Sequence, residues 1–140
     1  MATRFFFQDV KISLCNRKPL KWFIDSIFIR EKKGLASINY IFCTDQYLLD
    51  INKRFLKHDY FTDIITFNLA DPNGKIEGEI YISVDRVREN SKKMQVSLRE
   101  ELHRVIFHGA LHLCGYGDKG DKEKKKMTTA EDRYLRLYFK

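Results

Sequence analysis

The stretch from Ser97 to Asp118 constrains the fold most, because an amphipathic helical pattern in it ends abruptly. Ser97 and Glu100 form a capping box, which marks the first turn of a helix. The apolar residues that follow at helical spacing are Leu102, Val105, Ile106, Gly109 and Leu113. Gly115 comes next, at a place where a helix can stop in a left-handed turn that glycine enters at low cost. The sequence therefore predicts a long helix with one buried face and a tight turn behind it.

The other helices and strands are predicted from the spacing of apolar residues and from turn-forming residues. Strands are expected at residues 4–10, 36–43, 64–69 and 78–83, and the turn at 71–74 makes the last two an antiparallel hairpin. Helices are expected after Pro19, after the capping residue Thr44, over residues 84–94 and from near Asp121 onwards. The last of these is expected to bury Met127, Ala130, Tyr134, Leu137 and Tyr138. Strands mostly precede helices, which indicates an α+β fold with a small mixed sheet of about four strands covered by about five helices.

Length and composition are those of one globular domain, residues 1–140. The chain has 140 residues, 44% hydrophobic and 32% charged, with no repeat or linker-like segment. No run of about eighteen apolar residues appears, so no membrane span is expected. The three cysteines are irregularly spaced, which argues against a disulfide framework, and we expect the protein to remain in the cytoplasm.

The charge of the chain is basic. Lys and Arg number 26 against 19 Asp and Glu, a formal net charge of +7. Such an excess favours a polyanionic partner, because neutralising phosphates releases counterions. A basic surface that serves only solubility is the alternative.

His108 and His112 are the candidate metal ligands. Residues four apart on a helix lie one above the other, with Cβ atoms about 6 Å apart, so two imidazoles can close on one ion. The same spacing also occurs in solvated or core histidines. The turn through Tyr116 and Gly117 is expected to bring Asp118 back towards the histidine face as a third ligand. Catalytic zinc sites use three protein ligands and leave the fourth position to water. The sequence thus predicts a zinc site made by His108, His112 and Asp118, on a helix in the C-terminal half.

The residue after the first histidine argues against proteolysis. A zincin peptidase carries Glu there, as the general base for the attacking water. In this chain the position is Gly109.

The motif around the histidines resembles that of the YbeY family, endoribonucleases of ribosomal RNA maturation. The family motif H-G-x-L-H-L-x-G-Y is matched by His108 to Tyr116, and its G-D-I-x-I strand by Gly78 to Ile82. The upstream family pattern is matched by Asn52, Asp59, Thr62, Asp63 and Phe67. The resemblance covers most of the chain from Thr44 onwards.

Two departures from the family pattern bear on its chemistry. Asp118 stands where the family usually has a third histidine; aspartate is a competent zinc ligand, but its charge weakens the Lewis acidity of the ion and favours harder ions such as manganese. Leu56 stands where many members have an arginine. The neighbouring Lys57 and His58 are candidate catalytic helpers that would restore the lost charge, or else they are solvated loop residues.

The resemblance implies a zinc-dependent, single-strand-specific endoribonuclease with one Zn²⁺ per chain. Its expected roles are processing of the small-subunit ribosomal RNA 3′ end and ribosome quality control, with ribosomal RNA and the small ribosomal subunit as partners. The candidate RNA contacts are Lys57, His58 and Lys119, whereas the lysines from 122 to 126 are more typical of a solvated helix turn. A metal-dependent peptidase and a non-catalytic ribosome-assembly factor with a structural zinc are the alternatives.

Overall fold

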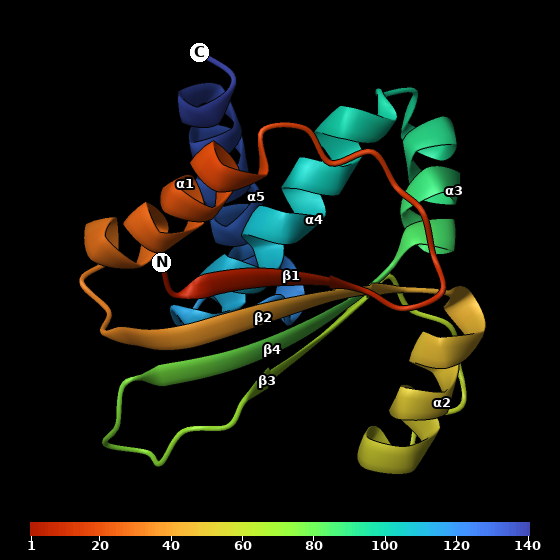
Figure 1. Ribbon diagram of the computed structural model, residues 1–140, viewed down its shortest axis with the longest axis horizontal. Coiled ribbons are helices and arrows are strands. Elements are labelled where there is room, and N and C mark those ends of the chain that lie inside the picture. The colour runs from red at the N-terminus through yellow and green to blue at the C-terminus, as the bar shows by residue number, and fades with distance from the viewer.

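The computed structural model describes residues 1–140 and has one four-stranded sheet and five helices (Figure 1). The strands are β1 (Thr3–Phe7), β2 (Leu35–Cys43), β3 (Ile64–Asn68) and β4 (Ile76–Ser83), and the helices are α1 (Arg17–Arg30), α2 (Asp45–Leu56), α3 (Val84–Met94), α4 (Leu98–Leu113) and α5 (Gly120–Tyr138). The predicted α+β fold with a small mixed sheet is confirmed. None of the helices has both the length and the apolar character needed to span a bilayer.

The sheet has the strand order β1-β2-β4-β3. β1, β2 and β4 run parallel, and β3 lies antiparallel to β4 at one edge. The predicted hairpin is therefore confirmed, and in its register Ile64 lies opposite Ile82. Parallel neighbours need crossover connections, which α1 provides between β1 and β2.

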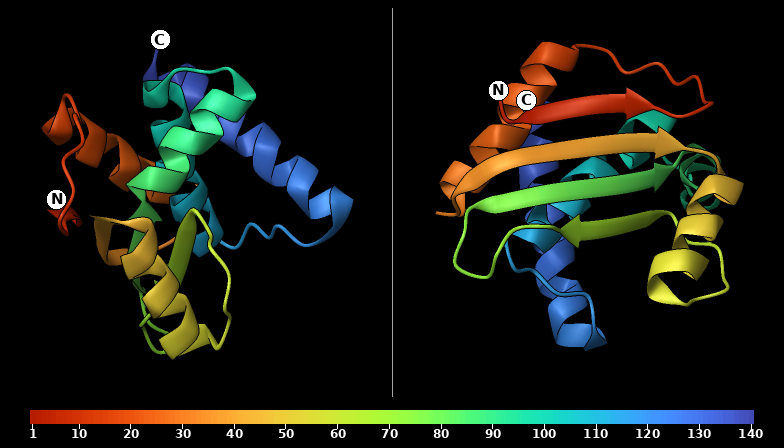
Figure 2. Two further views of the ribbon diagram at one scale, coloured as in Figure 1. Left: turned by 90° about the vertical axis from the view of Figure 1, so that its right-hand side faces the viewer. Right: turned by 60° about the horizontal axis from the view of Figure 1, so that its bottom comes forward.

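The helices are divided unequally between the two faces of the sheet. Figure 2 shows α1, α4 and α5 behind the sheet, while α2 lies across one end of the opposite face. The main core fills the first side, where Tyr40 and Phe42 of β2 are fully buried against the helices. A smaller cluster joins Leu48 and Ile51 of α2 to Ile65 of β3. The alternation of residues along each strand separates these two cores.

α4 lies close to the sheet because small residues face it. A Cβ atom added at Gly109 would lie 2.8 Å from Cδ1 of Ile80, and Gly78 of β4 leaves the space that the Leu113 side chain fills. The hydroxyl of Tyr40 also donates a hydrogen bond of 2.7 Å to the Ile106 carbonyl of α4. These contacts fix the rotation of α4 on the sheet.

Local signals in the sequence set most helix boundaries. Thr44 accepts a hydrogen bond from the Tyr47 amide at 3.1 Å, and Ser97 accepts one from the Glu100 amide at 3.0 Å, so both predicted caps are confirmed. The predicted burial of Leu137 is wrong, because its side chain is 36% exposed. Leu135 is buried in its stead, since the buried stripe of α5 turns towards that side of the helix.

Tyr40→Phe is expected to lower the free energy of unfolding by about 1 kcal/mol, because the substitution removes one buried hydrogen bond between β2 and α4. Urea unfolding measures this change. The matched control is Tyr47→Phe on α2, whose hydroxyl is partly exposed and makes no hydrogen bond within the protein, and whose effect should stay within about 0.5 kcal/mol. Equal effects of the two substitutions would contradict this role of the Tyr40 hydroxyl.

Candidate functional site

α4 ends in a turn that reverses the chain. Gly115 has φ of 108°, and its amide donates to the His112 carbonyl at 3.0 Å. The Tyr116 amide donates to the Leu111 carbonyl at 3.1 Å, which completes a Schellman motif. The turn brings the Asp118 carboxylate to 4.0 Å from Nε2 of His108. The left-handed glycine expected from the sequence is therefore present, and it places two of the three predicted ligands side by side.

Both histidines of α4 use Nδ1 for a hydrogen bond within the protein. His108 pairs through Nδ1 with the Glu131 carboxylate of α5 at 2.6 Å. His112 pairs through Nδ1 with the Tyr116 carbonyl, which can only accept, at 3.1 Å. With the proton on Nδ1, each imidazole keeps the lone pair of Nε2 for another partner. This is how metal-bound histidines are held, with the second nitrogen oriented by a carboxylate or a carbonyl.

A cavity of about 370 Å³ opens beside His108. We call it the acidic cavity, because its lining includes the carboxylates Asp63, Glu101, Asp118 and Glu131. Arg104 is the one Lys or Arg side chain in the lining, and it is paired with Glu131 at 2.9 Å and with Asp132 at 2.7 Å. The cavity therefore carries an excess of negative charge, which favours a cation.

The pKa shifts agree with a site short of positive charge. Burial lowers the pKa of His108, but the hydrogen bond and charge of Glu131, helped by Asp63 and Asp118, outweigh it and raise the pKa above its usual value. Burial raises the pKa of Asp63, and burial together with the charge of Asp63 raises that of Glu101. Oε1 of Glu101 is buried without a hydrogen-bond partner.

The imidazole and carboxylate groups of the three candidate ligands are of the kinds that bind divalent cations, and two of the three lie close together. No three His, Cys, Asp or Glu side chains converge closely enough to hold an ion in their present rotamers. His108 and Asp118 face each other in the acidic cavity, whereas the exposed His112 lies one turn further along α4 and does not line it. The side chain of Asp118 is 52% exposed, so it is free to rotate towards an ion. The unpartnered oxygen of Glu101 adds to the excess of acidic groups in the cavity.

The other candidates from the sequence lie outside the acidic cavity. Lys57 ends α2 with a left-handed backbone, φ of 56°. The ring of His58 stacks on Tyr60, and its Nδ1 is 2.9 Å from the Tyr60 hydroxyl. Lys119 precedes α5, and its amide donates to Glu123 at 3.3 Å. None of the three lines the cavity, although Asp63, at the end of the loop that follows Lys57 and His58, does.

The sequence analysis missed both Glu131 and Glu101. A signal for Glu131 was present, because it lies on the buried stripe of α5 with Met127 and Tyr134, where an unpaired charge is costly. Glu101 precedes His108 by seven residues, two helical turns, and so shares its side of α4. An acid at a core position of a helix is a sign of a partner in the interior, which for Glu131 is His108.

Comparison with known proteins places this site in a family. The family model of Endoribonuclease YbeY matches residues 8–138. An Endoribonuclease YbeY of Cytophaga hutchinsonii is 47% identical over 95% of this chain and 93% of its own length. One from Parabacteroides distasonis is 40% identical over 98% of this chain and 96% of its own length.

The chain belongs to the YbeY family. A Thermotoga maritima protein solved in solution has the same fold, with a TM-score of 0.68 and 27% identity over 98% of this chain and 89% of its own. The resemblance inferred from the histidine motif is thus confirmed, and it extends from the motif to nearly the whole chain. The family assignment does not depend on the metal ligands, whose role stays a prediction.

Glu131→Gln is expected to lower the pKa of His108 in metal-free protein, because the carboxylate that outweighs burial is removed. The folded pKa of His108 is raised, so its contribution to stability is complete below the unfolded value of about 6.5 and is lost as the pH rises through the folded pKa. At pH 6 we expect the variant to lose about 2 kcal/mol of unfolding free energy. NMR titration of the histidines in chelator and urea unfolding measure the two effects.

Asp132→Asn is the control for this substitution. Asp132 pairs with the same Arg104 but makes no hydrogen bond to His108. The pKa of His108 should therefore hardly change in that variant. A similar pKa shift in both variants would contradict the direct role of Glu131.

Proposed function

We propose that this chain is a metal-dependent endoribonuclease that acts in ribosomal RNA processing. The observation that carries the proposal is the acidic cavity, into which a half-buried, carboxylate-oriented histidine faces. The named function of the relatives that match nearly the whole chain supports the same reaction. Nuclease chemistry of this kind needs a cation and a basic surface for phosphates; the carboxylates of the acidic cavity favour a cation, and the net charge of +7 favours a polyanion.

We propose zinc as the ion, one per chain, with His108, His112 and Asp118 as its ligands. Zinc supplies Lewis acidity, which activates water and stabilises charge on a phosphoryl oxygen. Glu131 fixes the tautomer and orientation of His108, and Arg104 holds Glu131 in place. The Tyr116 carbonyl does the same for His112.

The proposed substrate is single-stranded RNA at the 3′ end of small-subunit ribosomal RNA. The small ribosomal subunit is the proposed partner, ribosome quality control a second role, and the cytoplasm the proposed location. Lys57, His58 and Lys119 are the proposed phosphate contacts. Leu56, which stands in place of the family arginine, is 39% exposed. Lys57 and His58 directly follow it and are proposed to replace the charge of that arginine.

The geometry of Gly109 disfavours the alternative of a peptidase. The position faces the sheet, where even a Cβ atom would lie 2.8 Å from Ile80. A glutamate there would not reach the acidic cavity, so the general base of a zincin has no place at this position. Metal-dependent cleavage of casein would support the peptidase instead. A ribosome-assembly factor that uses zinc only for stability would bind RNA and leave it intact.

Asp118→Ala is expected to weaken zinc binding by at least about tenfold. Removing a residue that only hydrogen-bonds to a metal ligand already costs about that much, and Asp118 is proposed as a ligand itself. Zinc titration of chelator-stripped protein against a chromophoric chelator measures the affinity. Asp121→Ala, an exposed acid of α5 outside the acidic cavity, should leave it unchanged. Equal affinities of the wild type and Asp118→Ala would remove Asp118 from the ligand set.

His112→Ala is expected to reduce cleavage of single-stranded RNA to background while leaving the fold intact, because its side chain is exposed. Cleavage of a labelled oligonucleotide is compared at equal folding, as judged by circular dichroism. His58→Ala, the same change in an exposed histidine outside the acidic cavity, should weaken RNA binding and keep most of the rate at saturating RNA. If His112→Ala cleaves as fast as the wild type, a contaminating ribonuclease explains the activity and the nuclease proposal fails.

A further inference from the structure

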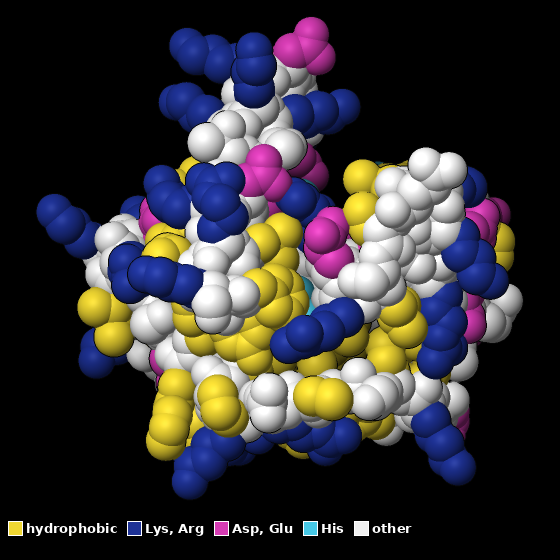
Figure 3. Space-filling view, turned by 90° about the horizontal axis from the view of Figure 1, so that it is seen from above, with side chains coloured by type: hydrophobic (Ala, Val, Ile, Leu, Met, Phe, Trp, Pro, Cys, Tyr) yellow, Lys and Arg dark blue, Asp and Glu magenta, His cyan; other side chains and the backbone are white.

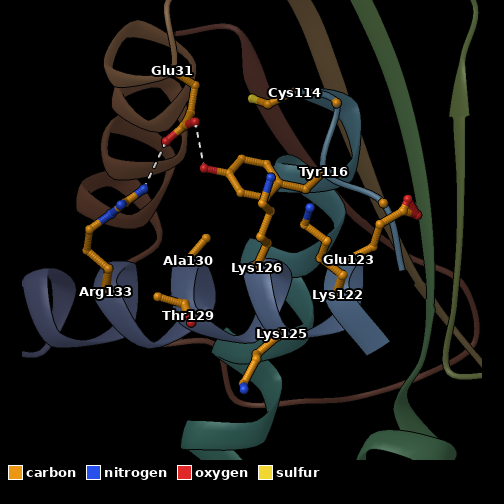
Figure 4. Close-up of a pocket in the computed structure, with 12 residues that line it drawn as sticks. Glu31, Cys114, Tyr116, Lys122, Glu123, Lys125, Lys126, Thr129, Ala130 and Arg133 are labelled. Atoms are coloured by element: carbon orange, nitrogen blue, oxygen red, sulfur yellow. Dashed lines mark hydrogen bonds and ion pairs between the residues drawn. The ribbon is translucent and has the colours of Figure 1, made fainter. Parts of the chain in front are cut away.

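A second cavity, of about 890 Å³, lies between α1 and α5 (Figure 4). We call it the basic groove; Tyr116, Lys122, Lys126 and Arg133 contribute to its lining. It shares no lining residue with the acidic cavity. The turn between α4 and α5 borders both, because Gly115 to Gly117 line the basic groove while Asp118 lines the acidic cavity.

Two lysines of α5 face the basic groove together. Lys122 and Lys126 are four residues apart, so they lie on one side of the helix. Figure 4 shows both side chains rising towards Tyr116, whereas Lys125 points away. None of the lysines from 122 to 126 makes an ion pair.

The two carboxylates that line the basic groove, Glu31 and Glu123, already accept hydrogen bonds from other groups of the protein. Glu31 accepts hydrogen bonds from the Tyr116 hydroxyl at 3.0 Å, the Tyr134 hydroxyl at 2.5 Å and Arg133 at 3.2 Å. Glu123 accepts one from the Lys119 amide at 3.3 Å. Three lysines of the groove lining, Lys122, Lys125 and Lys126, are therefore left without an ion pair, and Lys122 and Lys126 are the two that point into the groove.

The lysines stand where they cost stability. Positive charge in the first turn, where Lys122 lies with Asp121 and Glu123, opposes the helix dipole, and the like charges of Lys122 and Lys126, four residues apart, repel each other. The first two turns of α5 are exposed up to Met127, which is the first buried residue of the helix. Figure 2 shows this end of α5 projecting from the body, and Figure 3 shows Lys and Arg side chains, with a few Asp or Glu, along the projection. An anionic ligand would remove both penalties.

We propose that the basic groove binds the phosphodiester backbone of the RNA strand beside the segment in the acidic cavity. The inference rests on the proposed endoribonuclease function. Tyr116 joins the basic groove to a candidate metal ligand, because its carbonyl pairs with Nδ1 of His112 while Tyr116 itself lines the groove, and Asp118 of the acidic cavity follows two residues later. A strand that passes over this turn reaches Lys122 and Lys126 directly after leaving the histidines. An acidic protein would lack this continuity with the site.

The test measures RNA affinity without cleavage. Fluorescence anisotropy of a labelled single-stranded RNA long enough to span both places is recorded in chelator, over a range of salt. Lys122→Gln with Lys126→Gln should weaken binding on the order of tenfold at 0.1 M salt. The negative slope of log K against log salt should become less steep by about 1.4, the value for two phosphate contacts. The control pair, Lys124→Gln with Lys140→Gln, removes the same charge without touching the groove lining and should bind within about twofold of the wild type.

Two results would overturn the inference. Equal weakening in both pairs would show that only bulk charge matters, and unchanged RNA affinity in the groove pair would leave the groove to an acidic protein partner. Cleavage of a short oligonucleotide that fills only the acidic cavity separates this inference from the nuclease proposal. The groove pair should cleave such an oligonucleotide at the wild-type rate, whereas His112→Ala should not. Circular dichroism verifies that each pair remains folded.

Discussion

Glu131 places a carboxylate that is 6% exposed between two basic groups of α4. Its two oxygens take Nδ1 of His108 at 2.6 Å and Arg104 at 2.9 Å. A buried carboxylate is stable only when it is paired and hydrogen-bonded, so α5 docks on α4 in a position that makes both contacts. That docking orients the candidate metal ligand. It also sets where the lysine-rich end of α5 projects and where Arg133 and Tyr134 reach Glu31 of α1.

The two cavities have opposite charge and meet at one turn. A polyanion alone would be repelled by the carboxylates of the acidic cavity, and a divalent cation would reverse that repulsion. The basic groove has no such requirement, because its acids are occupied and its lysines are free. Under the proposed function, RNA would therefore enter the acidic cavity only together with the cation, whereas the basic groove would hold the strand with or without it. This separation suits an enzyme that must hold a flexible strand and cut it at one point.

The close approach of α4 to the sheet makes this arrangement possible. Gly109 and Gly78 remove side chains from the interface, and Tyr40 anchors the helix at Ile106, two residues before His108. The histidines consequently lie on the side of α4 that the sheet does not cover. The Schellman turn at Gly115 then returns the chain to that same side. Small residues and one positive φ thus account for the position of three candidate ligands.

The sequence by itself determined the local elements. Its caps at Thr44 and Ser97, its apolar periods and its glycine after α4 are short-range signals, which depend on hydrogen bonds and packing within a few residues. The histidine motif was also local, and it sufficed for the family. The tertiary structure decided the strand order, the pairing of Glu131 with His108 and the difference between Lys126 and Lys124. Each of these depends on which distant segments of the chain pack together. The spacing of residues along one helix cannot predict a partner 23 residues away, as Glu131 is from His108.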